Sequence, residues 1–312
     1  MLPRKALTPE GLFLYERKTG LCIFTPKVRS KGWIKPLYAQ ISVTEKCNQR
    51  CWWCYASSSP EKSCSLPLEE LKELMGFLDS WGVLGVAFGG GEPFMYPHLP
   101  EIAEWTWNNT GLDVSVTTNG TASSEEQISR LEGYVSEVRV SIRSVEACNT
   151  LLKFLNRKFG VGVNLLLLKG NTWALEEIVE ECLNRSVADF LVNDFRAFGR
   201  GAGQKHLKPG REDFTALAQL IEKHSWKAAF KTSGRLASKL KPYIHRFVPF
   251  QDERRGRIIA ITADRKVKPS SLSMEAYSYN NPEEIPKIYS RFIVDVTEEE
   301  ISREAHGRTE KK

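Results

Sequence analysis

Short apolar runs recur along the chain, and most are bounded by glycine, proline or small polar residues. Runs of this kind predict buried strands when they are too short to form a helix. The sequence places them at residues 37–43, 83–88, 112–117, 137–142, 161–168 and 187–192. We therefore expect six strands in this part of the chain.

Longer stretches between these runs carry apolar residues at helical spacing. The first has its apolar residues on one face between Leu68 and Leu78, and Pro67 suits a first helical turn. Further helices are expected at residues 99–108, from 123, at 145–157, from 171 and at 209–225. Strands separated by helices of this length favour βαβ units and a parallel sheet. Six such units predict an α/β fold with an open, partial (β/α)6 barrel, although a doubly wound sheet fits the same rhythm.

Both ends of the chain depart from this alternation. Residues 12–17 and 20–24 flank Lys18-Thr19-Gly20 and predict an N-terminal β-hairpin. After residue 226 the pattern predicts a strand at 226–231, a helix at 233–241 and a hairpin formed by 258–262 and 266–268. We divide the chain into a hairpin cap (1–36), a barrel (37–225), a small α+β extension (226–296) and a charged, frayed tail (297–312).

Composition places the chain among ordinary globular proteins. It has 312 residues, of which 41% are hydrophobic and 26% charged, and the net charge is +6. No apolar stretch approaches the ~20 residues that a membrane span needs, and the N-terminus lacks a secretory signal. We expect a cytoplasmic protein with no membrane or nucleic-acid partner. The basic clusters Arg196–Lys208 and Arg254–Arg257 are expected to be solvated surface.

Three cysteines follow the first predicted strand in the run Cys47-Asn48-Gln49-Arg50-Cys51-Trp52-Trp53-Cys54. Three thiolates on one loop can hold three irons of a [4Fe–4S] cluster and leave the fourth iron without a protein ligand. Electron-transfer clusters usually have cysteine on all four irons. Zinc usually takes four ligands, and no second C-x-x-C pair is present. The spacing therefore favours a cluster with one open iron.

The other cysteines are dispersed along the chain. Cys22 and Cys182 lie in apolar runs, where a buried thiol acts as a small hydrophobe. Cys64 comes ten residues after Cys54 and would complete a four-cysteine cluster. A non-catalytic iron–sulfur protein that carries electrons or senses redox state is therefore the alternative function.

The glycine-rich run Gly89-Gly90-Gly91-Glu92-Pro93 lies one βα unit after the cysteine loop. Alone it predicts only a tight turn, and it lacks the lysine of a phosphate-binding P-loop. Together with the C-x3-C-x2-C run, it resembles the radical S-adenosylmethionine (SAM) superfamily. The resemblance implies that Cys47, Cys51 and Cys54 hold a [4Fe–4S] cluster to which SAM binds. Reductive cleavage of SAM to a 5′-deoxyadenosyl radical would then abstract hydrogen from a substrate.

The same resemblance implies positions for SAM contacts. Trp53 would lie near the adenine, or simply cover the cluster together with Trp52. Gly89, Gly90, Gly91 and Glu92 would hold the amino group of SAM, and Thr118 and Asn119 would face the site from the next strand. Ser141 would end the following strand at the same site. Asn164 lies in Val161-Gly162-Val163-Asn164, which begins the next strand and resembles the stretch beside the adenine; it would hydrogen-bond there or satisfy the sheet. Arg143 stands where many relatives have aspartate, and would bind the SAM carboxylate or remain a solvated arginine.

The resemblance extends weakly to the branch with a C-terminal auxiliary cluster, the SPASM and twitch proteins. Phe198-Gly199-Arg200-Gly201 and residues 258–271 carry it. These relatives usually end the last hairpin in Pro-Cys, whereas this chain has Pro269-Ser270 and no cysteine after residue 182. An auxiliary cluster held by cysteines is therefore not expected. The implied substrate is a peptide or a small biosynthetic intermediate, the implied electron donor is a ferredoxin or flavodoxin, and Arg196, Arg200 and Lys205 would edge the substrate opening.

Overall fold

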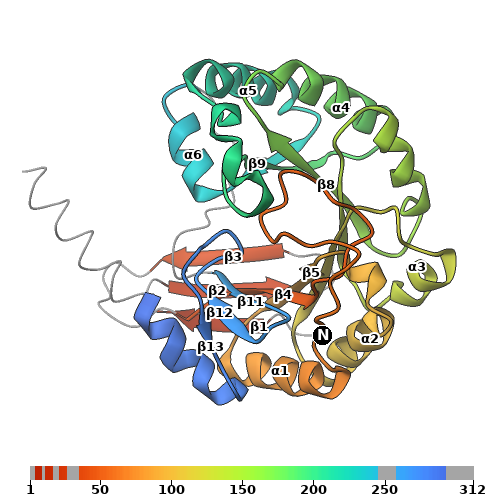
Figure 1. Ribbon diagram of the computed structural model, residues 1–312, viewed down its shortest axis with the longest axis vertical. Helices are drawn as coiled ribbons and strands as arrows, with labels where there is room; N and C mark the ends of the chain where they lie inside the picture. The colour runs from red at the N-terminus through yellow and green to blue at the C-terminus, as the bar shows by residue number, and fades with distance from the viewer. Residues whose placement is uncertain (1–3, 9–10, 17–20, 27–34, 245–257, 293–312) are drawn as a thin grey trace, which may run out of the picture.

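The computed structural model describes residues 4–8, 11–16, 21–26, 35–244 and 258–292 (Figure 1). In the main sheet, seven strands lie side by side in the order of the sequence, each parallel to its neighbours. They are β4 (Tyr38–Thr44), β5 (Gly85–Gly90), β6 (Asp113–Thr118), β7 (Glu137–Ser141), β8 (Gly160–Leu167), β9 (Asp189–Asp194) and β10 (Ala229–Thr232). The first six match the six predicted strands, so that prediction is confirmed.

Helical segments connect these strands. They are α1 (Leu68–Trp81), η1 (Pro93–Met95), α2 (Leu99–Asn109), α3 (Glu125–Leu131), η2 (Glu146–Lys153), α4 (Thr172–Asn184), η3 (Gly199–Gly203), η4 (Lys205–Leu207), α5 (Arg211–His224) and α6 (Gly234–Leu240). Because neighbouring strands follow one another without a reversal of order, the connections all wind in one direction, and the helices cover one face of the curved sheet (Figure 1). The fold is a partial barrel, and the doubly wound alternative is wrong.

Strand alternation separates two layers of side chains. On β7, Val138 and Val140 are fully buried against the helices, while Glu137, Arg139 and Ser141 lie on the opposite, inner face. The apolar layer between sheet and helices is the core of the molecule. The inner face is therefore free to carry polar groups at the C-terminal ends of the strands, where sites gather in parallel folds.

Two predicted elements differ from the sequence pattern. The helix expected at 145–157 is the 3₁₀ segment η2. The strand expected from Trp226 begins only at Ala229, because the amides of Lys227 and Ala228 donate to the His224 carbonyl and extend the turn after α5. Both differences lie at element boundaries, which the apolar pattern defines poorly.

The N-terminal hairpin is present as β2 (Gly11–Glu16) and β3 (Leu21–Pro26), and β1 (Arg4–Thr8) adds a third antiparallel strand. The third strand was not predicted. The predicted turn at Lys18-Thr19-Gly20, the cluster Arg254–Arg257 and the tail from Thr297 lie outside the described residues.

The C-terminal segment adds strands to the other edge of the main sheet. β11 (Ile258–Ile261) pairs in parallel with β4, and β12 (Lys266–Lys268) and β13 (Tyr277–Ser278) follow in antiparallel order. The predicted hairpin of 258–262 and 266–268 is thereby confirmed. η5 (Pro282–Glu284) follows, and residues 285–292 are helical. Every helix in the described ranges is too short or too polar to cross a membrane. The division of the chain into four domains remains a prediction.

Candidate functional site

The cysteine loop begins where β4 ends, at the C-terminal edge of the sheet. The amide of Cys47 donates to the carbonyl of Ser59 at 3.1 Å, and the amide of Cys54 donates to the carbonyl of Cys51 at 3.1 Å. Cys47 is buried, while Cys51 and Cys54 are partly exposed. The loop therefore holds one cysteine in a buried position and two in partly exposed ones.

The thiols are close enough to affect one another's protonation. Burial is the largest cause that raises the pKa of Cys47, and the Cys51 and Cys54 thiols raise it further. Burial also raises the pKa of Cys51, as does Cys54, while the charges of Arg143 and Arg200 oppose the shift. Three thiolates gathered in one place need a positive centre to neutralise them, and soft sulfur ligands suit iron. The loop thus fits an iron–sulfur cluster.

Arg200 holds the cysteine loop through its backbone carbonyls. Its Nε donates to the carbonyl of Cys51 at 2.9 Å, and its amide donates to the carbonyl of Cys54 at 3.1 Å. Gly199 has φ +57°, and a Cβ there would lie 2.4 Å from the carbonyl oxygen of Tyr55. Sequence reasoning expected Arg200 at the substrate opening and missed this contact. The signal was the Phe198-Gly199-Arg200-Gly201 run, whose glycines permit the close approach.

Cys64 takes a different direction from the three loop cysteines. Its thiol donates to the carbonyl of Ala263 at 3.3 Å, in the turn between β11 and β12. Its carbonyl accepts from the amide of Glu45 at 2.8 Å, at the base of the loop. The backbone of Cys64 therefore braces the loop while its thiol contacts the C-terminal hairpin.

The glycines at the end of β5 and just after it have two different roles. A Cβ on Gly90 would lie 2.4 Å from the carbonyl oxygen of Thr44, and a Cβ on Gly91 would lie 2.1 Å from that of Lys46. These two glycines let the backbone pack against the base of the cysteine loop, where the Gly91 amide donates to Thr44 at 2.7 Å. A Cβ on Gly89 would meet nothing within 4 Å, so this position faces open space.

Glu92 ties the ends of β5 and β6 together. Its carboxylate is 1% exposed and accepts from the Thr118 hydroxyl at 2.6 Å, the Asn119 amide at 2.7 Å and the Phe94 amide at 3.2 Å. Burial raises the pKa of Glu92, and these three hydrogen bonds oppose the rise. Three of the roughly four acceptor positions of a carboxylate are thus used by the protein itself.

Asn119 follows β6 and links the end of that strand to the cysteine loop. Its Nδ2 donates to Asn48 Oδ1 at 2.9 Å and lies 3.9 Å from Cys47 Sγ. Gly120 has φ +73°, and a Cβ there would lie 2.3 Å from a methyl carbon of Thr150. Thr118 and Asn119 were predicted to face the site. They lie next to the cysteine loop and to Glu92.

The remaining predicted residues lie on β7 and β8 and in the loop after β7: Ser141 ends β7, Arg143 follows it, and Asn164 lies in the middle of β8. Ser141 pairs with Asn164 across these strands. Arg143 is exposed, and its Nη1 donates to the carbonyls of Ile142 at 2.9 Å and Asn164 at 2.7 Å. The guanidinium therefore sits on the rim of the barrel, near Cys51, and its charge opposes the rise that burial causes in the pKa of Cys51.

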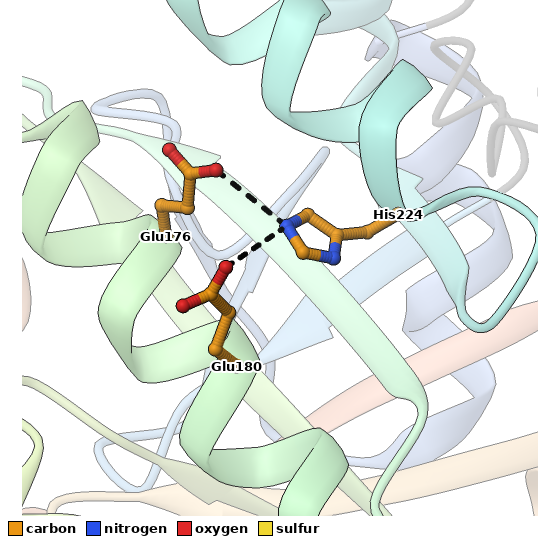
Figure 2. A group of neighbouring side chains, drawn as sticks. All are labelled: Glu176, Glu180 and His224. Carbon is orange, nitrogen blue, oxygen red and sulfur yellow. Dashed lines mark ion pairs between the residues drawn. The ribbon is translucent and has the colours of Figure 1, made fainter.

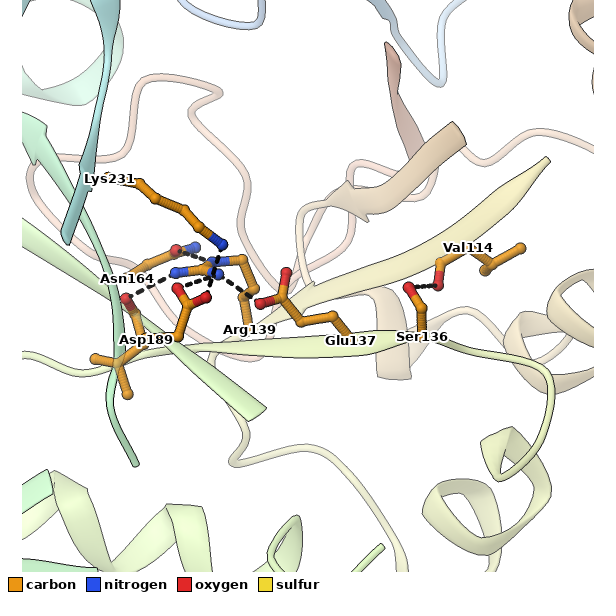
Figure 3. Close-up of polar contacts among 8 residues, drawn as sticks. Val114, Ser136, Glu137, Arg139, Asn164, Asp189 and Lys231 are labelled. Carbon is orange, nitrogen blue, oxygen red and sulfur yellow. Dashed lines mark hydrogen bonds and ion pairs between the residues drawn. The ribbon is translucent and has the colours of Figure 1, made fainter. Parts of the chain in front are cut away.

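A charged network crosses the inner face of the sheet below this rim (Figure 3). Arg139 is 8% exposed and donates to Glu137 at 2.6 Å, to Asp189 at 2.9 Å and to the Asn164 side chain at 3.0 Å. Lys231 donates to the second oxygen of Asp189 at 2.6 Å. Burial would raise the pKa of Asp189, but Arg139 and Lys231 outweigh it and hold the pKa below its usual value. The Asn164 side chain thus binds Arg139 on the inner face of the barrel.

Aromatic rings lie beside the cysteine loop. The rings of Trp52 and Trp53 meet edge to face with centroids 5.1 Å apart, and Trp52 contacts Phe195 at 5.6 Å. Trp52 is 38% exposed. A Cβ on Gly201 would lie 2.9 Å from the Phe195 ring, so this glycine leaves room for the aromatic group.

Comparison with known families identifies one matching family model. Residues 41–182 match the model described as the radical SAM superfamily. This range contains the cysteine loop, the glycine run and the ends of β6 to β8.

Two curated relatives illustrate the sequence similarity. The antilisterial bacteriocin subtilosin biosynthesis protein AlbA of Bacillus subtilis is 28% identical over 189 residues, which cover 55% of this chain and 42% of AlbA. The GTP 3′,8-cyclase of Chlorobaculum tepidum is 31% identical over 110 residues, which cover 35% of this chain and 33% of the cyclase. The matched segments thus span less than half the length of either relative.

Among solved structures, the fold is similar to that of SuiB from Streptococcus suis. The TM-score is 0.68 at 13% identity, and the alignment covers 93% of this chain and 88% of SuiB. SuiB bound to the precursor peptide SuiA gives a TM-score of 0.67 at 14% identity, over 91% of this chain and 86% of that one. At this identity the similarity concerns the fold alone.

Proposed function

Because this chain belongs to the radical SAM superfamily, whose members use a [4Fe–4S] cluster and SAM, we propose that it is an enzyme that modifies a peptide by hydrogen abstraction. When bound, the cluster and SAM supply the electron and the radical chemistry of that reaction. The observation that carries the proposal is the arrangement of thiols. Cys47, Cys51 and Cys54 share one loop, while the thiol of Cys64 contacts Ala263 instead.

The three loop cysteines would hold the cluster, and the side chains around them would position it. Arg200 fixes the carbonyls of Cys51 and Cys54, and the Asn119 amide group lies near the Cys47 sulfur. Hydrogen bonds to cluster ligands tune the reduction potential. These residues therefore act by positioning the loop and adjusting the electronic state of the cluster.

SAM would bind along the C-terminal ends of β5 to β8. The open space at Gly89 admits a ligand close to the backbone, whose carbonyls suit the cationic amino group. Glu92 would fix the course of this backbone through Thr118 and Asn119, because its carboxylate is already engaged with them. Arg143 at the rim would hold the SAM carboxylate.

The adenine of SAM would lie farther along the same strand ends. Trp53 would contact it from the cysteine loop, and Ser141 and the backbone of Asn164 would contact it from β7 and β8. The Asn164 side chain is bound to Arg139 and would orient its own backbone rather than the ligand.

A peptide substrate is supported by the similar proteins and by the extent of the fold. AlbA is named for bacteriocin biosynthesis, and SuiB has been solved with a precursor peptide. The structural similarity to SuiB covers 93% of this chain. We further propose a ferredoxin or flavodoxin as electron donor and a cytoplasmic location, which keeps the thiols reduced.

Anaerobic reconstitution followed by dithionite and SAM tests the enzymatic reaction. The expected result is 5′-deoxyadenosine above background in the wild type and in Cys64→Ala, and none in Cys51→Ala, which loses a cluster ligand. A cluster that survives in Cys51→Ala but is lost in Cys64→Ala would indicate a different ligand set. An intact cluster that yields no 5′-deoxyadenosine in the wild type would contradict the proposal.

A second assay tests the substrate class. Peptides encoded next to the gene for this chain would be incubated with the reduced enzyme and SAM, and their masses compared before and after. The expected result is a mass change that requires both SAM and Cys51. Turnover of a nucleotide or tetrapyrrole with no change in any peptide would assign the chain to small-molecule biosynthesis instead.

A further inference from the structure

A group of side chains outside the barrel interior converges between α4 and α5 (Figure 2). Glu176 and Glu180 lie one turn apart on α4, and His224 is the last residue of α5. His224 Nε2 lies 3.6 Å from Glu176 Oε1 and 3.9 Å from Glu180 Oε1. One donor atom from each residue lies within 4.8 Å of the others.

The imidazole of His224 is buried beside these carboxylates with one ring nitrogen unpaired among the described residues. The residue is 7% exposed, and its Nε2 is buried without a hydrogen-bond partner among the described residues. The separations from the two carboxylates are longer than a hydrogen bond. A buried ring nitrogen left without a partner is costly, and it points directly between the two carboxylates (Figure 2).

We propose that Glu176, Glu180 and His224 bind a divalent first-row transition metal ion such as Zn²⁺. In a tetrahedral site with bonds of roughly 2.0–2.1 Å, donor atoms lie about 3.4 Å apart. The separations of 3.6 and 3.9 Å therefore need only small side-chain rotations. Zinc accepts imidazole nitrogen and carboxylate oxygen as ligands, and a water would complete four-coordination here. The nitrogen ligand disfavours Mg²⁺ and Ca²⁺.

Lys223 is the internal competitor for this site. Its ammonium donates to Glu176 at 2.5 Å and to Glu180 at 3.2 Å, so one positive charge already lies beside the carboxylates. The Lys223 side chain is 58% exposed and can turn into solvent when a dication binds. The two carboxylates are thus arranged around a cation. The ammonium of Lys223 cannot donate an electron pair to a metal, whereas His224 Nε2 offers a metal a third ligand atom.

A metal at this position would join two neighbouring helices. α4 follows β8 and α5 follows β9, and the two helices contact each other in the outer layer. A ligand that binds only the folded chain stabilises it in proportion to its concentration and affinity. The expected effect is therefore on stability, independent of SAM cleavage.

Calorimetric titration of the cluster-loaded protein with Zn²⁺ tests the proposal, with cluster absorbance followed throughout. The wild type should bind one Zn²⁺ and show a higher melting temperature with zinc, whereas Mg²⁺ should do neither. His224→Gln and Glu180→Gln should each weaken binding at least about tenfold. Glu180 is half exposed, so its variant is expected to fold. Glu177→Gln, which removes an exposed carboxylate from the same helix, should bind as the wild type.

Lys223→Gln separates the metal site from a simple ion-pair cluster. If the trio binds zinc, removal of the competing ammonium should tighten binding several-fold. Zinc binding that is absent from both the wild type and Lys223→Gln, or equal in the wild type, His224→Gln and Glu180→Gln, would overturn the proposal. The trio would then be an ion-pair cluster only.

Discussion

At the scale of single residues, the cysteine loop is held by two neighbouring segments of the chain. Arg200 donates to the carbonyls of Cys51 and Cys54, and Gly91 packs against the carbonyl of Lys46. Both contacts act on backbone carbonyls, so the thiols remain available to iron.

Arg200→Ala should weaken retention of the cluster. Loss of the side-chain hydrogen bond to Cys51 costs about 1–2 kcal/mol of loop stability. Arg200→Lys should recover part of it, because an ammonium can reach one carbonyl but lacks the planar guanidinium. Iron per protein after desalting and the melting temperature measure the effect, with the exposed Lys205→Ala as control. Equal iron content in Arg200→Ala and the control would contradict the role of this contact.

Gly91→Ala should lower the stability of the cysteine loop, whereas Gly89→Ala should leave stability unchanged and weaken SAM binding. A Cβ at residue 91 would meet the Lys46 carbonyl oxygen at 2.1 Å, so the cysteine loop must shift, at a cost of about 1–3 kcal/mol. A Cβ at residue 89 meets nothing within 4 Å and leaves the fold unchanged. If SAM lies beside Gly89, the second variant should keep its cluster but bind SAM more weakly. Melting temperatures and SAM titrations would check both results, and unchanged SAM affinity in Gly89→Ala would argue against this placement.

Some residue contacts could not be predicted because they join distant positions in the sequence. The cysteine loop is local, so its spacing alone predicted a cluster. The Cys148 and Cys182 sulfurs lie 3.9 Å apart in the core, although nothing in their sequence neighbourhoods predicts this contact. The role of Arg200 likewise depends on a loop that returns across about 150 residues to the cysteines, a separation recorded by its bond to Cys51.

At the scale of elements, the strands were predictable but the interior of the barrel was not. Apolar runs located the six predicted strands because each strand is buried against helices. The network around Arg139 needs the register of β7 to β10, which the pattern does not define. Gly162 illustrates this, because a Cβ there would lie 2.6 Å from Arg139 Nη1. This glycine on β8 makes room for an arginine on β7.

Asp189→Asn should lower stability at neutral pH, with a difference that disappears in acid. The pKa of Asp189 lies below its usual value in the folded chain, so its contribution is complete above the unfolded pKa of about 4. It is lost as the pH falls through the folded pKa. We expect a loss of about 2 kcal/mol at pH 7.

Denaturant unfolding of Asp189→Asn and the wild type between pH 7 and pH 3 measures this difference. The control is Glu212→Gln, at the exposed start of α5. A difference between the wild type and Asp189→Asn that stays constant over this range would show that the charge of Asp189 is not involved.

At the scale of the whole molecule, the C-terminal segment belongs to the same sheet as the barrel. β10 lies beside β9, and β11 pairs with β4, which leads directly into the cysteine loop. The Cys64 thiol contacts the turn of the C-terminal hairpin at Ala263. The change of rhythm after residue 226 predicted these elements but not their attachment to both edges, because strand pairing between distant segments leaves no local trace in the sequence.

The central claim is that the cluster has one iron without a side-chain ligand and that SAM binds there. Electron paramagnetic resonance of the dithionite-reduced, cluster-loaded protein, recorded with and without SAM, tests it most directly. We predict that SAM changes the spectrum of the reduced cluster in the wild type and in Cys64→Ala alike. Identical spectra before and after addition of SAM would contradict the account.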